Sequence, residues 1–186
     1  MPDYPEKTAP ILCVLGLGSN KSYKGFPSSE LITAAAAELQ KIFTDIRLSP
    51  FYKTAPLYVT DQEPFINAAV SGIFSFTQTK PNNKSLFFAS YELLAAIQKI
   101  EARYGRNRDN ERRWGERTLD IDILLFGDLV LAENNLVIPH PRLKERAFAL
   151  RPLLDLLPDA TEPGTGKRYD KILAELPSQE IDHYKP

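Results

Sequence analysis

Cysteine is almost absent from this sequence of 186 residues, whose single thiol, Cys13, falls in an apolar stretch. One cysteine excludes a disulfide framework and fits a reducing compartment. Long hydrophobic runs are also lacking, which excludes a membrane span, and residues 1–10 are too polar to form a signal peptide. We therefore expect a soluble, cytoplasmic protein without a membrane partner.

An excess of charge of one sign is the third absence. Lysine and arginine number 23 and aspartate and glutamate 24, which gives a formal net charge of −1. Such a balance gives no global reason to expect a nucleic-acid partner, so any basic cluster is a local feature. The length predicts one domain over 1–186, with a catalytic core at about 11–158 and peripheral ends at 1–10 and 159–186. We expect a monomer, although no sequence feature specifies the oligomeric state.

Apolar periodicity predicts six main elements. Short apolar runs predict strands, and apolar residues at helical spacing predict helices. In chain order they are a strand at 11–17, a helix capped by Ser28 or Ser29, strands at 46–54 and 67–76, a helix at 86–104 and a strand at 119–126. This order predicts an α+β fold of the ferredoxin-like βαββαβ type, an antiparallel sheet with helices packed on one face, plus C-terminal extras.

Smaller elements are expected beyond the last of these strands. Residues 130–131 predict a short strand, and residues 142–150 predict a helix that stops at Pro152. A further short helix is expected at 170–176. The stretch TEPGTGKR at 161–168 lacks the first glycine and the final Ser or Thr of a phosphate-binding P-loop, so we interpret it as a turn.

The most informative stretch is RRWGERTLDID at 112–122, where an arginine-rich loop runs into a strand. Side chains alternate across a strand, so Asp120 and Asp122 share one face, which continues as Leu124 and Phe126. Two like charges so placed repel each other and lose hydration. Carboxylates completed by water and phosphate are the usual ligands of Mg²⁺, which would compensate both charges. The alternative is a structural pair of carboxylates bound to arginine.

Five arginines occur in this loop, at positions 106, 108, 112, 113 and 117, together with Trp114, the only tryptophan. So much positive charge near the centre of a fold indicates an anion, and guanidinium groups match phosphate oxygens bidentately. Glu101 falls in the apolar stripe of the preceding helix, where it either turns to water or serves a site. The glycines of GLGSN at 16–20 lack the third glycine of a dinucleotide fingerprint and are interpreted as a turn.

Five motifs together resemble the 6-hydroxymethyl-7,8-dihydropterin pyrophosphokinase family of folate biosynthesis. They are GLGSN at 16–20, FYKTAPL at 51–57, FINAAV at 65–70, RWGERTLDID at 113–122 with LLFG at 124–127, and IPHP at 138–141 with RAF at 146–148. The resemblance covers about 15–158 and implies a ferredoxin-like fold. It also implies transfer of the β,γ-diphosphate of ATP to the pterin hydroxymethyl group, with release of AMP.

The resemblance implies roles for individual residues at the phosphate end of the site. Asp120 and Asp122 match the ligands of two Mg²⁺ ions that hold the triphosphate. Catalytic roles are implied for both aspartates and for the loop arginines Arg106, Arg108, Arg113 and Arg117. Contacts to ATP are implied for Gln98, Glu101, Arg106, Arg113, Arg117, Ile123, His140 and Arg146.

The resemblance also implies a pterin-binding set, and with it two small-molecule partners, ATP and the reduced pterin. Phe65 and Phe148 would stack on the two faces of the flat ring. Backbone groups and the Asn67 amide would read its hydrogen-bonding edge. The full set is Thr54, Pro56, Leu57, Phe65, Asn67, Trp114, Asp120 and Phe148.

Three departures from the family pattern occur. Phe65 stands where some members carry tyrosine, which keeps the stacking and loses a hydroxyl. Pro141 follows His140 where others have tyrosine. The arginine loop is one residue longer, so Arg112 and Arg113 compete for one position, and we assign it to Arg113 because that residue directly precedes Trp114.

Two rival functions deserve comparison. Ferredoxin-like sheets with exposed aromatics bind single-stranded RNA, but here acids occupy the central strand and the net charge is close to zero. A relative that keeps the fold without catalysis is the second rival. The presence of both aspartates and the arginines argues against it.

Overall fold

The structure is a computed structural model that describes residues 8–57, 59–77, 82–108, 112 and 114–186. The elements are β1 (Thr8–Ser19), α1 (Ser28–Leu39), β2 (Phe43–Leu48), β3 (Phe51–Thr54), β4 (Phe65–Thr77), α2 (Asn83–Arg103), β5 (Asp120–Phe126), β6 (Leu131–Glu133), β7 (Leu136–Ile138), the 3-10 helix η1 (Leu143–Glu145), α3 (Ala147–Leu156), α4 (Tyr169–Glu175) and β8 (Ile181–Tyr184).

The main sheet is antiparallel and has the strand order β5-β1-β4-β3-β8, with β2 also paired to β4. Its core therefore follows the expected order β1-α1-β2/β3-β4-α2-β5, which confirms the α+β, ferredoxin-like prediction. β6 and β7 form a separate hairpin close to the predicted short strand. Among the described residues, no helix has the length and apolar character needed to cross a bilayer.

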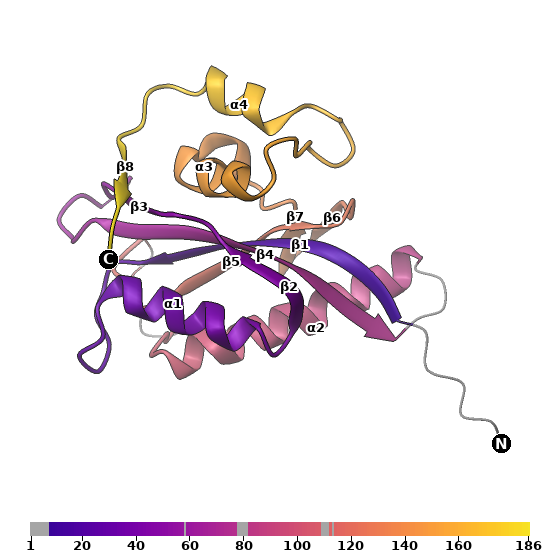
Figure 1. The fold of residues 1–186 in the computed structure, drawn as a ribbon, viewed down its shortest axis with the longest axis horizontal. Helices are drawn as coiled ribbons and strands as arrows, with labels where there is room; N and C mark the ends of the chain where they lie inside the picture. Colours follow the sequence, from indigo (N-terminus) through magenta and orange to yellow (C-terminus); the bar gives the residue numbers. More distant parts are fainter. Residues whose placement is uncertain (1–7, 58, 78–81, 109–111, 113) are drawn as a thin grey trace.

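The two helices of the predicted core, α1 and α2, cover one face of the sheet, and the C-terminal helices α3 and α4 cover the other (Figure 1). On one face α1 and α2 bury side chains such as Ile32 and Leu93 against β1, β4 and β5. On the other face α3 and α4 bury Leu150 and Tyr169 against Val14 and its neighbours. The apolar residues of α3 and α4 thus build a second core layer, which burial of apolar area stabilises.

The single strand predicted at 46–54 is two strands joined at Ser49 and Pro50. Ser49 N–H donates to the Ala69 carbonyl at 2.9 Å, and Ala69 N–H donates to Ser49 Oγ at 2.8 Å. The hydroxyl replaces a backbone acceptor where the strand bends, and Pro50 has no N–H to pair. β2 also begins at Phe43, earlier than predicted.

Several helix boundaries differ from the sequence-based expectation, since α2 begins at Asn83, before the expected residue 86, and the helix expected from 142 is the short η1 followed by α3 from Ala147. The residue that precedes α1 is Pro27, and no side chain caps this end, so neither Ser28 nor Ser29 has the predicted role. α3 continues through Pro152 to Leu156. Proline inside a helix costs roughly 3 kcal/mol, but burial of Leu153 and Leu156 on the sheet offsets this cost.

A bulge in β5 reverses the alternation of its last side chains. Val14 of β1 pairs with Leu125 and the next residue, Leu15, pairs with Ile123, so Leu124 is the extra residue. Phe126 consequently packs with α1 and α2. The prediction that it shares a face with Asp122 is wrong.

The C-terminal strand β8 was not predicted. It pairs with β3 at the edge of the sheet, with Thr54 opposite Ile181 and Phe51 opposite Tyr184. The other terminus also departs from expectation, because β1 begins at Thr8 and takes in part of the segment expected to be peripheral. The predicted short helix at 170–176 is present as α4, and TEPGTGKR is a turn closed by Thr161 and Arg168, as predicted.

Candidate active site

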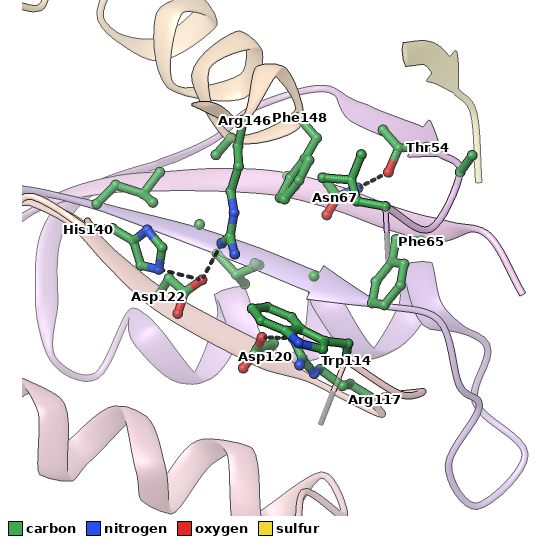
Figure 2. A pocket seen from close by; sticks show the side chains of 18 of the residues that line it. Thr54, Phe65, Asn67, Trp114, Arg117, Asp120, Asp122, His140, Arg146 and Phe148 are labelled. Atoms are coloured by element: carbon green, nitrogen blue, oxygen red, sulfur yellow. Dashed lines mark hydrogen bonds and ion pairs between the residues drawn. The ribbon is translucent and has the colours of Figure 1, made fainter. Parts of the chain in front are cut away.

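One cleft lies on the α3 face of the sheet, where β1, β4 and β5 meet the start of α3 (Figure 2). Its volume, open mouth included, is about 860 Å³, within the range of small-molecule sites, roughly 300–1,000 Å³. Most of the side chains selected from the sequence line it. They are Thr54, Leu57, Phe65, Asn67, Trp114, Arg117, Asp120, Asp122, His140, Arg146 and Phe148.

Glycines of β1 keep the base of the cleft open beside the two aspartates. The register pairs Gly18 with Asp120 and Gly16 with Asp122. Cross-strand partners point to the same face of a sheet, so side chains at either glycine would project into the cleft. A Cβ at Gly18 would lie 3.3 Å from Asn67 Oδ1. Gly16 to Ser19 of the GLGSN motif therefore belong to β1, so the interpretation as a turn is wrong, and the glycines leave room for a ligand.

Asp120 is held by arginines. Arg117 Nη1 lies 2.8 Å from Asp120 Oδ2, and Arg106 Nη2 lies 3.4 Å from Oδ1. The Arg106 side chain is only 8% exposed, so its charge is compensated largely inside the protein. Asp120 thus combines a position at the cleft with the structural pairing that was the alternative interpretation of its sequence pattern.

Asp122 has no such close cation among the described residues. His140 Nε2 and Arg146 Nη1 each lie 3.9 Å from its Oδ2 (Figure 2). Loss of hydration, followed by repulsion from Asp120, raises the pKa of the Asp122 carboxyl above its usual range. A cation bound at this carboxylate would remove that penalty.

The donor set fits Mg²⁺ that is also held by phosphate. The described residues contain no cluster of three or more His, Cys, Asp or Glu side chains that could hold a metal ion. Mg²⁺ does not require such a cluster, because one or two carboxylates with substrate phosphates and water complete its octahedron. Asp120 and Asp122, side by side at the cleft, supply such a pair.

His140 is a neutral hydrogen-bond donor at this site. Burial, and then the charge of Arg146, lower its pKa to about 4. Its Nδ1 accepts the N–H of Arg142 at 3.2 Å, so in the neutral ring the proton belongs on Nε2, which faces Asp122. Nε2–H can therefore donate to a carboxylate or phosphate oxygen without adding charge.

Glu101 is buried behind the site and is the inward-facing acid that the helical stripe indicated. Its side chain is 1% exposed and accepts from Ile121 N–H at 2.9 Å. Arg108 Nη2 donates to both carboxylate oxygens, at 2.9 and 2.7 Å. Burial raises the pKa of Glu101 despite this arginine. Glu101 thus ties α2 to the start of β5 and holds Arg108 near Asp120.

Several residues of the predicted nucleotide set lie outside the cleft lining. Gln98 is exposed on α2, and Ile123 is buried on the opposite face of the sheet, so only its backbone can reach a ligand from β5. Pro56 is half-buried beside the cleft without lining it. Arg113 lies outside the described residues, whereas Arg112 is exposed.

Aromatic and amide groups form the other end of the cleft. Phe65, at the start of β4, and Phe148, near the start of α3, both project into it (Figure 2). Asn67 Nδ2 donates to Thr54 Oγ1 at 2.8 Å, which orients the buried carboxamide. The arrangement offers a slot for a flat ring with an amide at its edge.

Two residues absent from the predicted set connect the loops around the cleft. Gln62 Nε2 donates to the Trp114 carbonyl at 3.0 Å, and Asn20 Nδ2 donates to Gln62 Oε1 at 3.1 Å. Asn20 Oδ1 accepts from Arg117 N–H at 2.8 Å. Asn20 belongs to the GLGSN motif and so had a signal in the sequence, whereas a glutamine in a proline-bearing loop had none.

Comparison with known proteins identifies the family. A family model described as 7,8-dihydro-6-hydroxymethylpterin-pyrophosphokinase (HPPK) matches residues 14–158. A 2-amino-4-hydroxy-6-hydroxymethyldihydropteridine pyrophosphokinase of Haemophilus influenzae is 35% identical over 93% of this chain and 95% of its own. An Arabidopsis thaliana folate synthesis bifunctional protein is 44% identical over 60% of this chain, which spans only about a fifth (20%) of that relative.

Solved structures agree on the fold. A crystal structure of Plasmodium falciparum HPPK-DHPS superposes with a TM-score of 0.66 at 15% sequence identity, covering 91% of this chain and 45% of that one. With a family model matched over residues 14–158 and a full-length relative at 35% identity, the chain belongs to the 7,8-dihydro-6-hydroxymethylpterin-pyrophosphokinase family.

Proposed function

We propose that this protein transfers the β,γ-diphosphate of ATP to the hydroxymethyl group of 6-hydroxymethyl-7,8-dihydropterin in folate biosynthesis. The observation that carries the proposal is one cleft with an aspartate pair and arginines at one end and an aromatic slot with an oriented amide at the other. The relatives' names support the same reaction.

The pterin would lie between Phe65 and Phe148, with its amide-like edge toward Asn67 and Thr54. Stacking of aromatic rings contributes about 0.5–1.5 kcal/mol beyond the area buried. The Thr54 hydroxyl fixes the Asn67 carboxamide, so the amide need not reorganise when the ring binds. This placement directs the hydroxymethyl group toward the aspartates.

The triphosphate would lie between the aspartates and the arginines. Two Mg²⁺ ions held by Asp120 and Asp122 would neutralise phosphate charge and make the β-phosphorus more electrophilic. Arg117 and Arg146 line the cleft and can donate to phosphate oxygens, and neutral His140 adds a further donor. The substrate hydroxyl oxygen forms a bond to the β-phosphorus and its proton passes to water, while the bond from that phosphorus to the α,β-bridging oxygen breaks and AMP leaves.

An RNA-binding function receives no support from the fold. Ferredoxin-like RNA readers use an open sheet face that carries stacking aromatics. In the described part of this chain α1 and α2 cover one face and α3 and α4 the other (Figure 1).

We further infer that residues 1–186 act as one domain, as a monomer and in the cytoplasm. One chain supplies both the aspartate pair and the aromatic slot, so the proposed chemistry needs no residue from a second copy. The molar mass of the purified protein at micromolar concentration, measured by light scattering, tests this inference. The mass of a stable dimer would contradict it.

The reaction is tested by separation of pterin products. Wild-type protein incubated with ATP, Mg²⁺ and the reduced pterin should yield a pterin diphosphate, and omission of Mg²⁺ should abolish it. The matched control is Asp122→Asn, which keeps the shape of the side chain and removes its charge. A pterin that remains unmodified with wild-type protein would overturn the proposal.

A further inference from the structure

Gln179 lies in the segment between α4 and β8, beyond the part of the chain matched by the family model. Its carboxamide makes two hydrogen bonds to the backbone at the start of α3. Oε1 accepts the N–H of Ala147 at 3.0 Å, and Nε2 donates to the carbonyl of Glu145 at 3.0 Å. These two peptide groups lie on either side of Arg146.

The backbone at Arg146 needs such a partner. Arg146 is extended, with φ −119° and ψ 98°, and separates η1 from α3. The first N–H of α3 has no partner within the helix, as at every helix start, and the Arg146 side chain does not cap it. Gln179 satisfies that N–H from outside and at the same time binds the preceding carbonyl, which holds the turn from both sides.

The turn carries two residues of the site. The Arg146 guanidinium lies 3.9 Å from Asp122 and 5.5 Å from the centre of the Phe148 ring. Both side chains project into the cleft from this one turn (Figure 2). A shift of the turn would therefore move a phosphate donor and an aromatic wall of the pterin slot together.

The segment that carries Gln179 is itself anchored beside the cleft. It runs directly into β8, which pairs with β3 so that Ile181 lies opposite Thr54. The His183 ring lies 4.7 Å from that of Tyr52. The C-terminal segment thus connects β3, which ends at Thr54, to the turn that carries Arg146.

We propose that Gln179 is a positioning residue of the active site, which sets the placement of Arg146 and Phe148 by binding the peptide groups on both sides of Arg146. The proposal rests on the proposed function, because the two side chains serve ATP and the pterin there. Gln179 itself lies outside the cleft lining and acts through its neighbours.

The test compares two variants that weaken the same segment in different ways. Gln179→Met keeps the length of the side chain and removes both hydrogen bonds. His183→Ala removes the contact with Tyr52 and keeps both hydrogen bonds of Gln179, so it controls for a general loss of stability. We expect Gln179→Met to lower kcat/KM by up to roughly 100-fold, the loss that a misplacement of about 1 Å can cause, with a raised KM for the pterin. His183→Ala should stay within about twofold at a temperature where both variants are folded.

A spectroscopic readout separates this proposal from the proposed function. The Arg146 Nε–H resonance in ¹⁵N-labelled protein should shift or broaden in Gln179→Met and stay unchanged in His183→Ala. If Gln179→Met has both wild-type kinetics and a wild-type Arg146 Nε–H resonance, the positioning role is overturned. Absence of pterin diphosphate with wild-type protein would overturn the proposed function instead, and the resonance would still decide whether Gln179 holds the turn.

Discussion

At the scale of single residues, the two aspartates of β5 differ in what compensates their charge. Asp120 is bound by Arg117 at 2.8 Å, whereas the nearest cation to Asp122 among the described residues, Arg146, lies at 3.9 Å. Both are required to hold Mg²⁺ in the proposed reaction. Their roles in the metal-free protein are therefore different.

Replacement of each aspartate by asparagine should separate catalysis from stability. Both variants should lose at least about 100-fold in kcat, because each removes a charged metal ligand. Asp120→Asn should also lower the free energy of unfolding by about 1–3 kcal/mol, because Arg106 and Arg117 lose a charged acceptor. Asp122→Asn should leave metal-free stability unchanged or raised, since it relieves repulsion. Denaturant titration in EDTA measures both, and a marked loss of stability in Asp122→Asn would favour a structural role.

Glu101 is the second residue whose replacement is informative. Glu101→Gln keeps an oxygen for Ile121 N–H but loses the charged pair with Arg108. Because Arg108 is half exposed, we expect a loss of about 1–3 kcal/mol in unfolding free energy, together with a fall in kcat/KM. Glu92→Gln, on the exposed side of the same helix, is the control and should change neither quantity. Equal behaviour of the two variants would contradict the role assigned to Glu101.

Sequence patterns predicted which side chains line the cleft better than they predicted which groups hydrogen-bond to each other around it. Alternation along β5 placed both aspartates on one face, and the structure brings them to the cleft with Asn67, Phe65 and Phe148. Gln62 escaped prediction because its bonds join loops far apart in the chain, to the Trp114 carbonyl among others. Periodicity carries no information about such contacts.

At the scale of elements, errors arose where tertiary packing overrides local preference. The bulge at Leu124 depends on the register with β1, which no pattern within β5 reveals. α3 passes through Pro152 because the residues beyond it are buried against the sheet. Strand and helix order, which local periodicity does encode, was predicted correctly.

The packing of β2 on β4 gives a prediction at this scale. A Cβ added at Gly72 would lie 2.8 Å from Phe43 Cβ, closer than such atoms approach. Gly72→Ala should therefore lower the free energy of unfolding by about 1–3 kcal/mol, measured by denaturant titration. The folded fraction should keep wild-type kcat/KM, because the site residue Asn67 lies near the start of β4 and Gly72 in its middle.

Ser75→Ala, at an exposed position of the same strand, is the matched control for Gly72→Ala and should leave stability within about 0.5 kcal/mol of wild type. Loss of activity in folded Gly72→Ala protein would mean that the middle of β4 is coupled to the site at its start. Unchanged stability would show that β2 can move away from β4 at little cost.

At the scale of the whole molecule, the second helical layer and β8 complete the cleft. α3 contributes Phe148 to the cleft, and Arg146 immediately precedes this helix. The segment before β8 holds the turn at Arg146 through the hydrogen bonds of Gln179. The part of the chain expected to be peripheral at 159–186 thus contacts the site's supporting backbone. Sequence patterns did not predict this, because β8 is short and its pairing partner β3 is more than 120 residues away (Thr54 to Ile181).

Diphosphate transfer is tested by following the β-phosphate of ATP. ATP labelled with ³²P at the β position should pass its label to the pterin, and unlabelled AMP should be the nucleotide product, only when the reduced pterin and Mg²⁺ are both present. Transfer of two phosphates is expected because the cleft joins the pterin slot to the aspartate pair and its arginines. Label that remains in the nucleotide as ADP, with a single phosphate on the pterin, would contradict diphosphate transfer.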